Sequence, residues 1–247
     1  MTASRPLGKP RKIAPSGGPP IRAVLGHGDL AASLIAIFPL FLIYEIGVAF
    51  TPAMNGVDFV SRNLFALVDY SRKDYLLIHG SLGLAFLIYL FVSRKRASHP
   101  IRRFPPMLAE SIVYALTLGA FIVFVMRKLL GIEPSLAAGG LTNVLLSFGA
   151  GVHEELVFRL GVCAGGAALL RLIGVRHALA VAAAFLVSSM LFSAAHHIGP
   201  MGEPFALPVF IYRTLAGLIF ATIFYYRSLA HAAYTHALYD VWVLVIR

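Results

Sequence analysis

The chain contains a series of apolar runs, each near 20 residues long, and this pattern limits the fold more than any other feature. A helix needs about 20 apolar residues to cross roughly 30 Å of hydrocarbon, whereas a membrane β-barrel strand is an alternating segment of about ten residues. The runs here do not alternate, and 59% of the 247 residues are hydrophobic while 13% are charged. The sequence therefore predicts an all-α, polytopic transmembrane helical bundle with about seven spans, within a range of six to eight.

The predicted spans divide the chain into three regions. Residues 1–29 form a basic, proline-rich tail with few large apolar residues, which is typical of disorder. Residues 30–140 hold the N-terminal transmembrane spans, and residues 141–247 hold a C-terminal transmembrane core that we expect to be catalytic. The expected elements are an interfacial helix at residues 59–68 and spans at residues 31–50, 75–93, 107–126, 141–173, 177–196, 205–226 and 228–246.

The run over residues 141–173 is too long for one straight span. At 1.5 Å per residue it would make a helix of about 50 Å, against roughly 30 Å of hydrocarbon. We therefore expect a tilt or a break around Gly149–Gly151, or an overhang beyond the membrane.

The positive charge of the chain indicates its topology. The formal net charge is +10, but the basic residues stand in short blocks between apolar runs, which argues against a nucleic-acid partner. With a cytoplasmic N-terminus, 13 of the 21 lysines and arginines lie on the inside and six on the outside, while Arg159 and Arg213 lie within spans. By the positive-inside rule, the sequence predicts a multi-pass protein of the cell membrane with its N-terminus in the cytoplasm.

Fixed charges interrupt the middle of the long apolar run, in the segment His153-Glu154-Glu155-Leu-Val-Phe-Arg159. A charge at bilayer depth costs roughly 2.5–3.5 kcal/mol on insertion scales, so such a group indicates a functional site. Glu155 and Arg159 are one helical turn apart and are expected to form an ion pair, whereas Glu154 lies roughly 140° from Arg159. Glu154 is therefore the candidate for proton transfer, and His153 is interpreted as a packing neighbour. A wholly structural ion cluster is the alternative.

Two later spans carry further ionisable pairs at helical spacing. Phe192 and His196 share one helix face, and so do His236 and Asp240. A lone histidine in a membrane helix often makes only an interhelical hydrogen bond. Together with Glu154, however, these groups indicate a polar chamber inside the bundle.

Hydrolysis by activated water is the chemistry that this set of residues favours. A carboxylate in an apolar cavity is suited to take a proton from water and to pass it to a leaving amine, while histidines stabilise the oxyanion. A zinc site built from His196, His236 and a carboxylate is the main rival. The metalloprotease motif His-Glu-x-x-His is absent, because Val157 stands at the position of its second histidine.

The three motifs, in this order and at these spacings, resemble the CAAX-protease and bacteriocin-processing family, also called the ABI or Rce1-like family. The resemblance covers roughly residues 141–242 and implies an intramembrane glutamate-dependent endopeptidase. It implies that Glu154 is the general base on water and His196 its catalytic partner, with His236 and Asp240 lining the oxyanion site. The family pattern often has asparagine where this chain has Asp240. Asp240 is then either neutral in an apolar site or accepts a hydrogen bond from His236 and orients it.

The functional prediction is therefore an endopeptidase that needs no cofactor and no metal. Its partners are the lipid bilayer and a peptide or protein substrate, a class that includes lipidated and membrane-associated proteins. The alternatives are a metal-dependent membrane protease using the same residues, or a non-enzymatic membrane scaffold, immunity factor or transporter.

Overall fold

The computed structural model describes residues 29–51, 54–93, 100–129, 131, 140–198 and 202–243. Within these ranges the protein consists of helices and their connections, without a β-strand, so the all-α prediction is confirmed. The predicted disordered tail lies outside the described residues, except for Asp29 at its end.

The described helices follow the predicted order. The element bounds are α1 (Leu30–Val48), α2 (Phe59–Leu67), α3 (Arg72–Ser93), α4 (Pro100–Phe124), η1 (Val125–Leu129), α5 (Leu141–Gly149), η2 (Ala150–Gly165), α6 (Gly166–Leu172), α7 (His177–Ala195), α8 (Leu207–Tyr226) and α9 (Leu229–Val241).

Five of the described helices are long and apolar enough to cross a membrane: α1, α3, α4 with η1, α7 and α8. They account for five of the seven predicted spans, and the protein is a helical membrane bundle. The last predicted span begins with α9, which has 13 residues and continues in π-helical winding through residues 242–243, while the rest of this span lies outside the described residues.

The long run over residues 141–173 forms one uninterrupted helical rod, α5–η2–α6. Its winding changes at Ala150 from α-helical to π-helical, and it returns to α-helical at Gly166. The break expected around Gly149–Gly151 is thus a change of winding, with no interruption of the helix. A π-helix is rare and is frequent at functional sites, and this one carries the Glu154-Glu155 pair.

Two glycines let neighbouring helices approach this rod closely. A Cβ atom on Gly149 would clash with the Tyr44 ring of α1, and one on Gly151 would lie 2.6 Å from the Ala233 carbonyl oxygen of α9. Glycine at these positions therefore brings α1 and α9 against the segment that holds Glu154.

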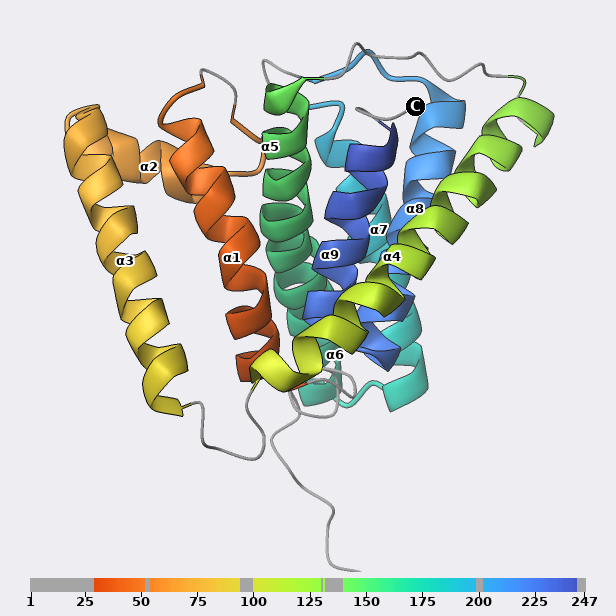
Figure 1. Ribbon diagram of the computed structural model, residues 1–247. Coiled ribbons are helices and arrows are strands. Elements are labelled where there is room, and N and C mark those ends of the chain that lie inside the picture. Colours follow the sequence, from red (N-terminus) through yellow and green to blue (C-terminus); the bar gives the residue numbers. More distant parts are fainter. Residues whose placement is uncertain are drawn as a thin grey trace, which may run out of the picture.

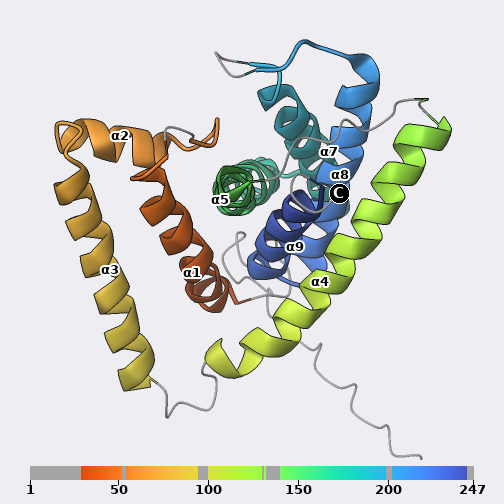
Figure 2. The same ribbon diagram turned by 45° about the horizontal axis from the view of Figure 1, so that its top comes forward.

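The rod stands at the centre of the bundle. In Figures 1 and 2, α1, α2 and α3 lie on one side of α5, and α4, α7, α8 and α9 lie on the other. The tightest helix pairs are α7 with α8, α4 with α9, and η2 with α7 and α9. The most peripheral span is α3, whose Leu77, Leu84 and Phe91 are exposed as expected of a lipid-facing helix.

Aspartate side chains cap the N-terminal ends of α1 and α2. Asp29 caps α1 by accepting a hydrogen bond from the Ala31 backbone amide, at 3.0 Å. Asp58 caps α2 by accepting from the Ser61 amide, at 2.9 Å. The Asp58 cap is fully buried and brings the loop between α1 and α2 against η2.

Candidate active site

A polar cavity of about 270 Å³ opens beside the middle of the rod. Its walls come from the α1–α2 loop, the start of η2, the C-terminal end of α7, the segment before α8, and α9. Its polar lining residues are Asn55, Glu154, His196, Glu203 and Asp240. The N-terminal and C-terminal halves of the chain therefore both contribute to this site.

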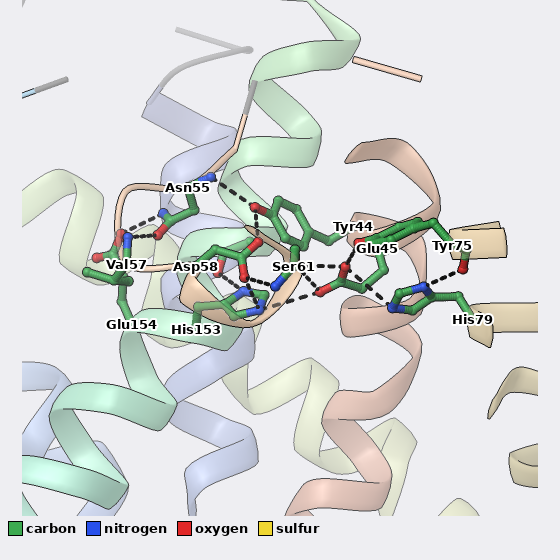
Figure 3. A network of polar contacts seen from close by, with 11 residues as sticks. Tyr44, Glu45, Asn55, Val57, Asp58, Ser61, Tyr75, His79, His153 and Glu154 are labelled. Atoms are coloured by element: carbon green, nitrogen blue, oxygen red, sulfur yellow. Dashed lines mark hydrogen bonds and ion pairs between the residues drawn. The ribbon is translucent and has the colours of Figure 1, made fainter. Parts of the chain in front are cut away.

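Glu154 lies in the wall of this cavity and is 5% exposed. Its Oε1 accepts a hydrogen bond from the Asn55 side-chain amide at 2.8 Å, as Figure 3 shows. Its Oε2 accepts no hydrogen bond within the described residues. No donor within the described residues therefore uses the lone pairs of this buried oxygen.

His196 is one turn beyond Phe192 at the end of α7, where its side chain is 28% exposed. Its Nδ1 donates a hydrogen bond to the Phe192 carbonyl at 2.9 Å, because a carbonyl oxygen can only accept. Its Nε2 lies 3.7 Å from Glu154 Oε2, which is too long for a direct hydrogen bond. Both groups therefore remain free to contact a substrate or a water molecule between them.

His236 lies deeper than His196, with its ring stacked on Phe220 at 4.5 Å between centroids. Its Nδ1 is 2.9 Å from Glu155 Oε1. Its Nε2 is 3.5 Å from Asp240 Oδ2 and 4.0 Å from Glu154 Oε2. The Nε2 edge of His236 thus faces the same region as Glu154, and the surrounding carboxylates stabilise positive charge on the imidazole.

The ion pair expected from the one-turn spacing is present under this site. Arg159 Nε lies 3.1 Å from Glu155 Oε2, and both side chains are fully buried. The Arg159 guanidinium also donates to Ser188 Oγ at 3.3 Å and lies 4.9 Å from the Phe192 ring centroid. Glu155 therefore joins Arg159 to His236, while Glu154 faces the cavity as the helical spacing predicted.

The structure brings the predicted site residues together and adds one that sequence reasoning missed. Glu154, His196, His236 and Asp240 converge, with Glu155 and Arg159 behind them. Asn55 was missed because it lies 99 residues before Glu154 in a loop, and no local spacing connects the two.

The rim of the cavity carries a second ion pair. Arg213 of α8 donates to both carboxylate oxygens of Glu203, at 2.8 and 2.9 Å. The hydrogen bond from Arg213 holds the pKa of the Glu203 carboxyl below its ordinary value. Glu203 is therefore a poor candidate for a proton donor at neutral pH.

This arrangement suits hydrolysis of a polar bond by water. A carboxylate with one fixed and one free oxygen can orient a water molecule and accept its proton. Two imidazole edges lie near that carboxylate, where hydrogen-bond donors stabilise a developing oxyanion. Among the described residues, the ligand atoms close enough to share a metal ion belong to a different group, Glu45, Asp58 and His153.

Comparison with known proteins gives one match. Residues 140–242 match the family model described as type II CAAX prenyl endopeptidase Rce1-like. The matched region begins just before α5 and ends just after α9, so it contains every predicted site residue and leaves out Asn55. No curated protein and no solved structure matches the chain.

Proposed function

This chain belongs, through residues 140–242, to the Rce1-like family of CAAX-type intramembrane proteases, and from this premise we propose that it cleaves peptide bonds with water activated by Glu154. The protein is a multi-pass membrane protein, so its substrate is a peptide or protein that reaches the cavity from the membrane or its surface. Of the substrate classes, a peptide with a prenylated cysteine near its C-terminus is the first to test.

The observation that carries the proposal is the buried Oε2 atom of Glu154. It accepts no hydrogen bond within the described residues and lies 3.7 Å from His196 Nε2 and 4.0 Å from His236 Nε2. In the proposed reaction this oxygen accepts a proton from water as the hydroxide attacks the scissile carbonyl carbon. In this step His196 is an imidazolium, with Nδ1–H on the Phe192 carbonyl and Nε2–H donating to the oxyanion, and His236 and Asp240 line the same space. Glu154 then passes the proton to the leaving amine as the C–N bond breaks.

Asn55 and Asp240 have different supporting roles. The Asn55 amide fixes one Glu154 oxygen and so determines where the other points. Asp240 faces His236 Nε2 at 3.5 Å, which supports the orienting role for this carboxylate over a direct contact with the oxyanion.

A cleavage assay on the purified full-length protein tests this function. The substrate is a farnesylated peptide ending in Cys-aliphatic-aliphatic-X with a fluorophore beyond the cysteine, and mass spectrometry identifies the bond cut. His196→Ala should slow cleavage by about 10²–10³-fold, as expected for loss of an oxyanion donor. The control, Glu110→Gln, changes a carboxylate that pairs with Arg227 and His231 at the other end of the bundle and should cleave normally.

The metal-dependent alternative makes a different prediction for the same variant. A zinc ion held by His196, His236 and a carboxylate would leave the protein when His196 is removed, together with the activity. The glutamate mechanism predicts that His196→Ala loses activity without losing any bound metal. Full activity in His196→Ala would contradict the proposed function. So would a wild-type protein that cleaves none of a panel of prenylated and unprenylated peptides.

A further inference from the structure

A second cluster of ionisable side chains lies on the other side of η2, outside the cavity. Its members are Glu45 of α1, Asp58 at the start of α2 and His153 of η2. Glu45 and Asp58 are fully buried and His153 is 4% exposed. Two carboxylates without solvent require positive charge, and their ion-pair partners within the described residues are histidines.

The hydrogen bonds of His153 leave one nitrogen directed at both carboxylates. Its Nδ1 lies 3.1 Å from the Gly149 carbonyl, which can only accept, so Nδ1 carries the proton. Its Nε2 makes no hydrogen bond within the described residues, although it lies 3.3 Å from Asp58 Oδ1 and 3.5 Å from Glu45 Oε1. A histidine that donates one N–H to a backbone carbonyl and presents its other nitrogen to carboxylates has the arrangement of a metal ligand.

The distances also fit a shared cation. Ligands that bind zinc at about 2.0–2.1 Å in tetrahedral geometry lie about 3.3–3.4 Å from one another. The two Nε2-to-oxygen distances of 3.3 and 3.5 Å match this separation, whereas charge-assisted hydrogen bonds are shorter, at about 2.7–2.9 Å. One divalent ion would also balance the two carboxylates while leaving His153 neutral.

A second layer of hydrogen bonds holds the carboxylates in place, as Figure 3 shows. Tyr44 donates to Asp58 Oδ2 at 2.8 Å, and the hydroxyls of Ser61 and Tyr75 contact Glu45. His79 repeats the pattern of His153, with Nδ1 on the Tyr75 carbonyl and Nε2 3.5 Å from Glu45 Oε2. Removing such outer contacts typically lowers metal affinity by about 10–100-fold.

We propose that Glu45, Asp58 and His153 bind one divalent transition-metal ion, with zinc the best match, as a structural site next to the catalytic cavity. Imidazole and carboxylate ligands together favour zinc over calcium or magnesium. The ion ties α1, the start of α2 and η2 together. A chain of hydrogen bonds connects the ion to the active site. The Tyr44 hydroxyl donates to Asp58 and accepts from the backbone amide of Asn55, and the side-chain amide of Asn55 donates to Glu154.

Metal analysis of the full-length protein, purified without chelators from zinc-supplemented cells, tests this site. Wild type should contain about one zinc ion per chain. Asp58→Asn and His153→Gln should lose most of it. The matched controls Glu154→Gln and Asp240→Asn change carboxylates of the cavity and should keep it, whatever their activity.

Two further measurements test the metal site even if a variant of one of its ligands fails to fold. After chelation, added Zn²⁺ should raise the unfolding temperature of wild type, and Co²⁺ in its place should give visible absorption bands of a tetrahedral site. His79→Gln, which removes an outer contact alone, should lower zinc affinity without abolishing binding. Wild type that contains no metal and gains no stability from Zn²⁺ or Mn²⁺ would overturn the proposal. Loss of zinc from Glu154→Gln, with retention in Asp58→Asn, would overturn it as well, since the ion would then lie in the cavity.

Discussion

His153 and Glu154 are neighbours on η2, yet they belong to two polar clusters that differ in access to water. The His153 side points to Glu45 and Asp58, both fully buried, while the Glu154 side points to a cavity where the side chains of His196 and Asp240 are 28% and 20% exposed. Figure 3 shows the two sides joined through Asn55 and Tyr44. The same residue types can therefore support chemistry where water enters and structure where it does not.

The difference also concerns how each carboxylate is satisfied. Glu45 and Asp58 have several hydrogen-bond donors, as a structural role requires, whereas Glu154 keeps one oxygen without a partner among the described residues. Leaving a buried polar atom unsatisfied costs about 1–3 kcal/mol. A bound substrate or water molecule would remove this cost at Glu154, which favours Glu154 over Glu45 as the base.

The largest expected effect on folding comes from the ion pair beneath the cavity. Glu155→Ala or Arg159→Ala leaves a fully buried charge without its partner, at a cost of about 3–5 kcal/mol in unfolding free energy. The double variant should recover part of this loss, because both charges leave together. Recovery should be incomplete, since His236 Nδ1 also loses its contact with Glu155. Thermal unfolding in detergent measures all three variants.

Glu154→Ala provides the comparison for that experiment, because it leaves no unpaired arginine. Equal destabilisation by Glu154→Ala and Glu155→Ala, with no recovery in the double variant, would mean that the assignment of the two glutamates is wrong.

A smaller effect is expected at Asn55, which connects the two clusters. Asn55→Ala removes the hydrogen bond to Glu154 Oε1, and hydrogen bonds to charged groups contribute about 1.5–3 kcal/mol. The catalytic rate should fall about 10–100-fold while the zinc content stays the same. Steady-state cleavage kinetics with metal analysis checks both, with Thr51→Ala, outside the cavity lining, as the control in the same loop. A loss of zinc with unchanged cleavage would show that Asn55 serves the buried cluster instead.

The smallest effect is expected at the Glu203–Arg213 pair on the rim of the cavity. The hydrogen bond from Arg213 lowers the pKa of Glu203 below the ordinary value of about 4.3. The pair therefore stabilises the fold above that pH. The benefit disappears as the pH falls through the lowered pKa. Glu203→Gln should therefore reduce unfolding free energy by at most about 1 kcal/mol at pH 7, since the carboxylate is half exposed. Unfolding curves at pH 7 and pH 4 should show the difference shrinking at the lower pH, and a constant difference would contradict the pair's role.

Sequence reasoning succeeded where the contacts are local. The pairs Glu155 with Arg159, Phe192 with His196, and His236 with Asp240 follow from helical periodicity, and all three are neighbours in the structure. Periodicity of a regular α-helix could not indicate the π-helical winding of η2.

The parts that were missed depend on contacts between distant segments. Glu45 and His153 lie more than 100 residues apart in the sequence, and Asp58 comes from a loop with no periodic pattern. Hydropathy placed Glu45 in a span but gave no partner for it.

Cleavage and thermal unfolding of Glu154→Gln, measured on one preparation, test the central claim most directly. Glutamine keeps the shape and most hydrogen bonding of the side chain but cannot accept a proton from water. The account predicts a variant that unfolds at or above the wild-type temperature, retains its zinc, and cleaves the peptide at least about 10³-fold more slowly. A folded Glu154→Gln protein that cleaves at a rate close to that of wild type would contradict it, because the base would then have to be another residue.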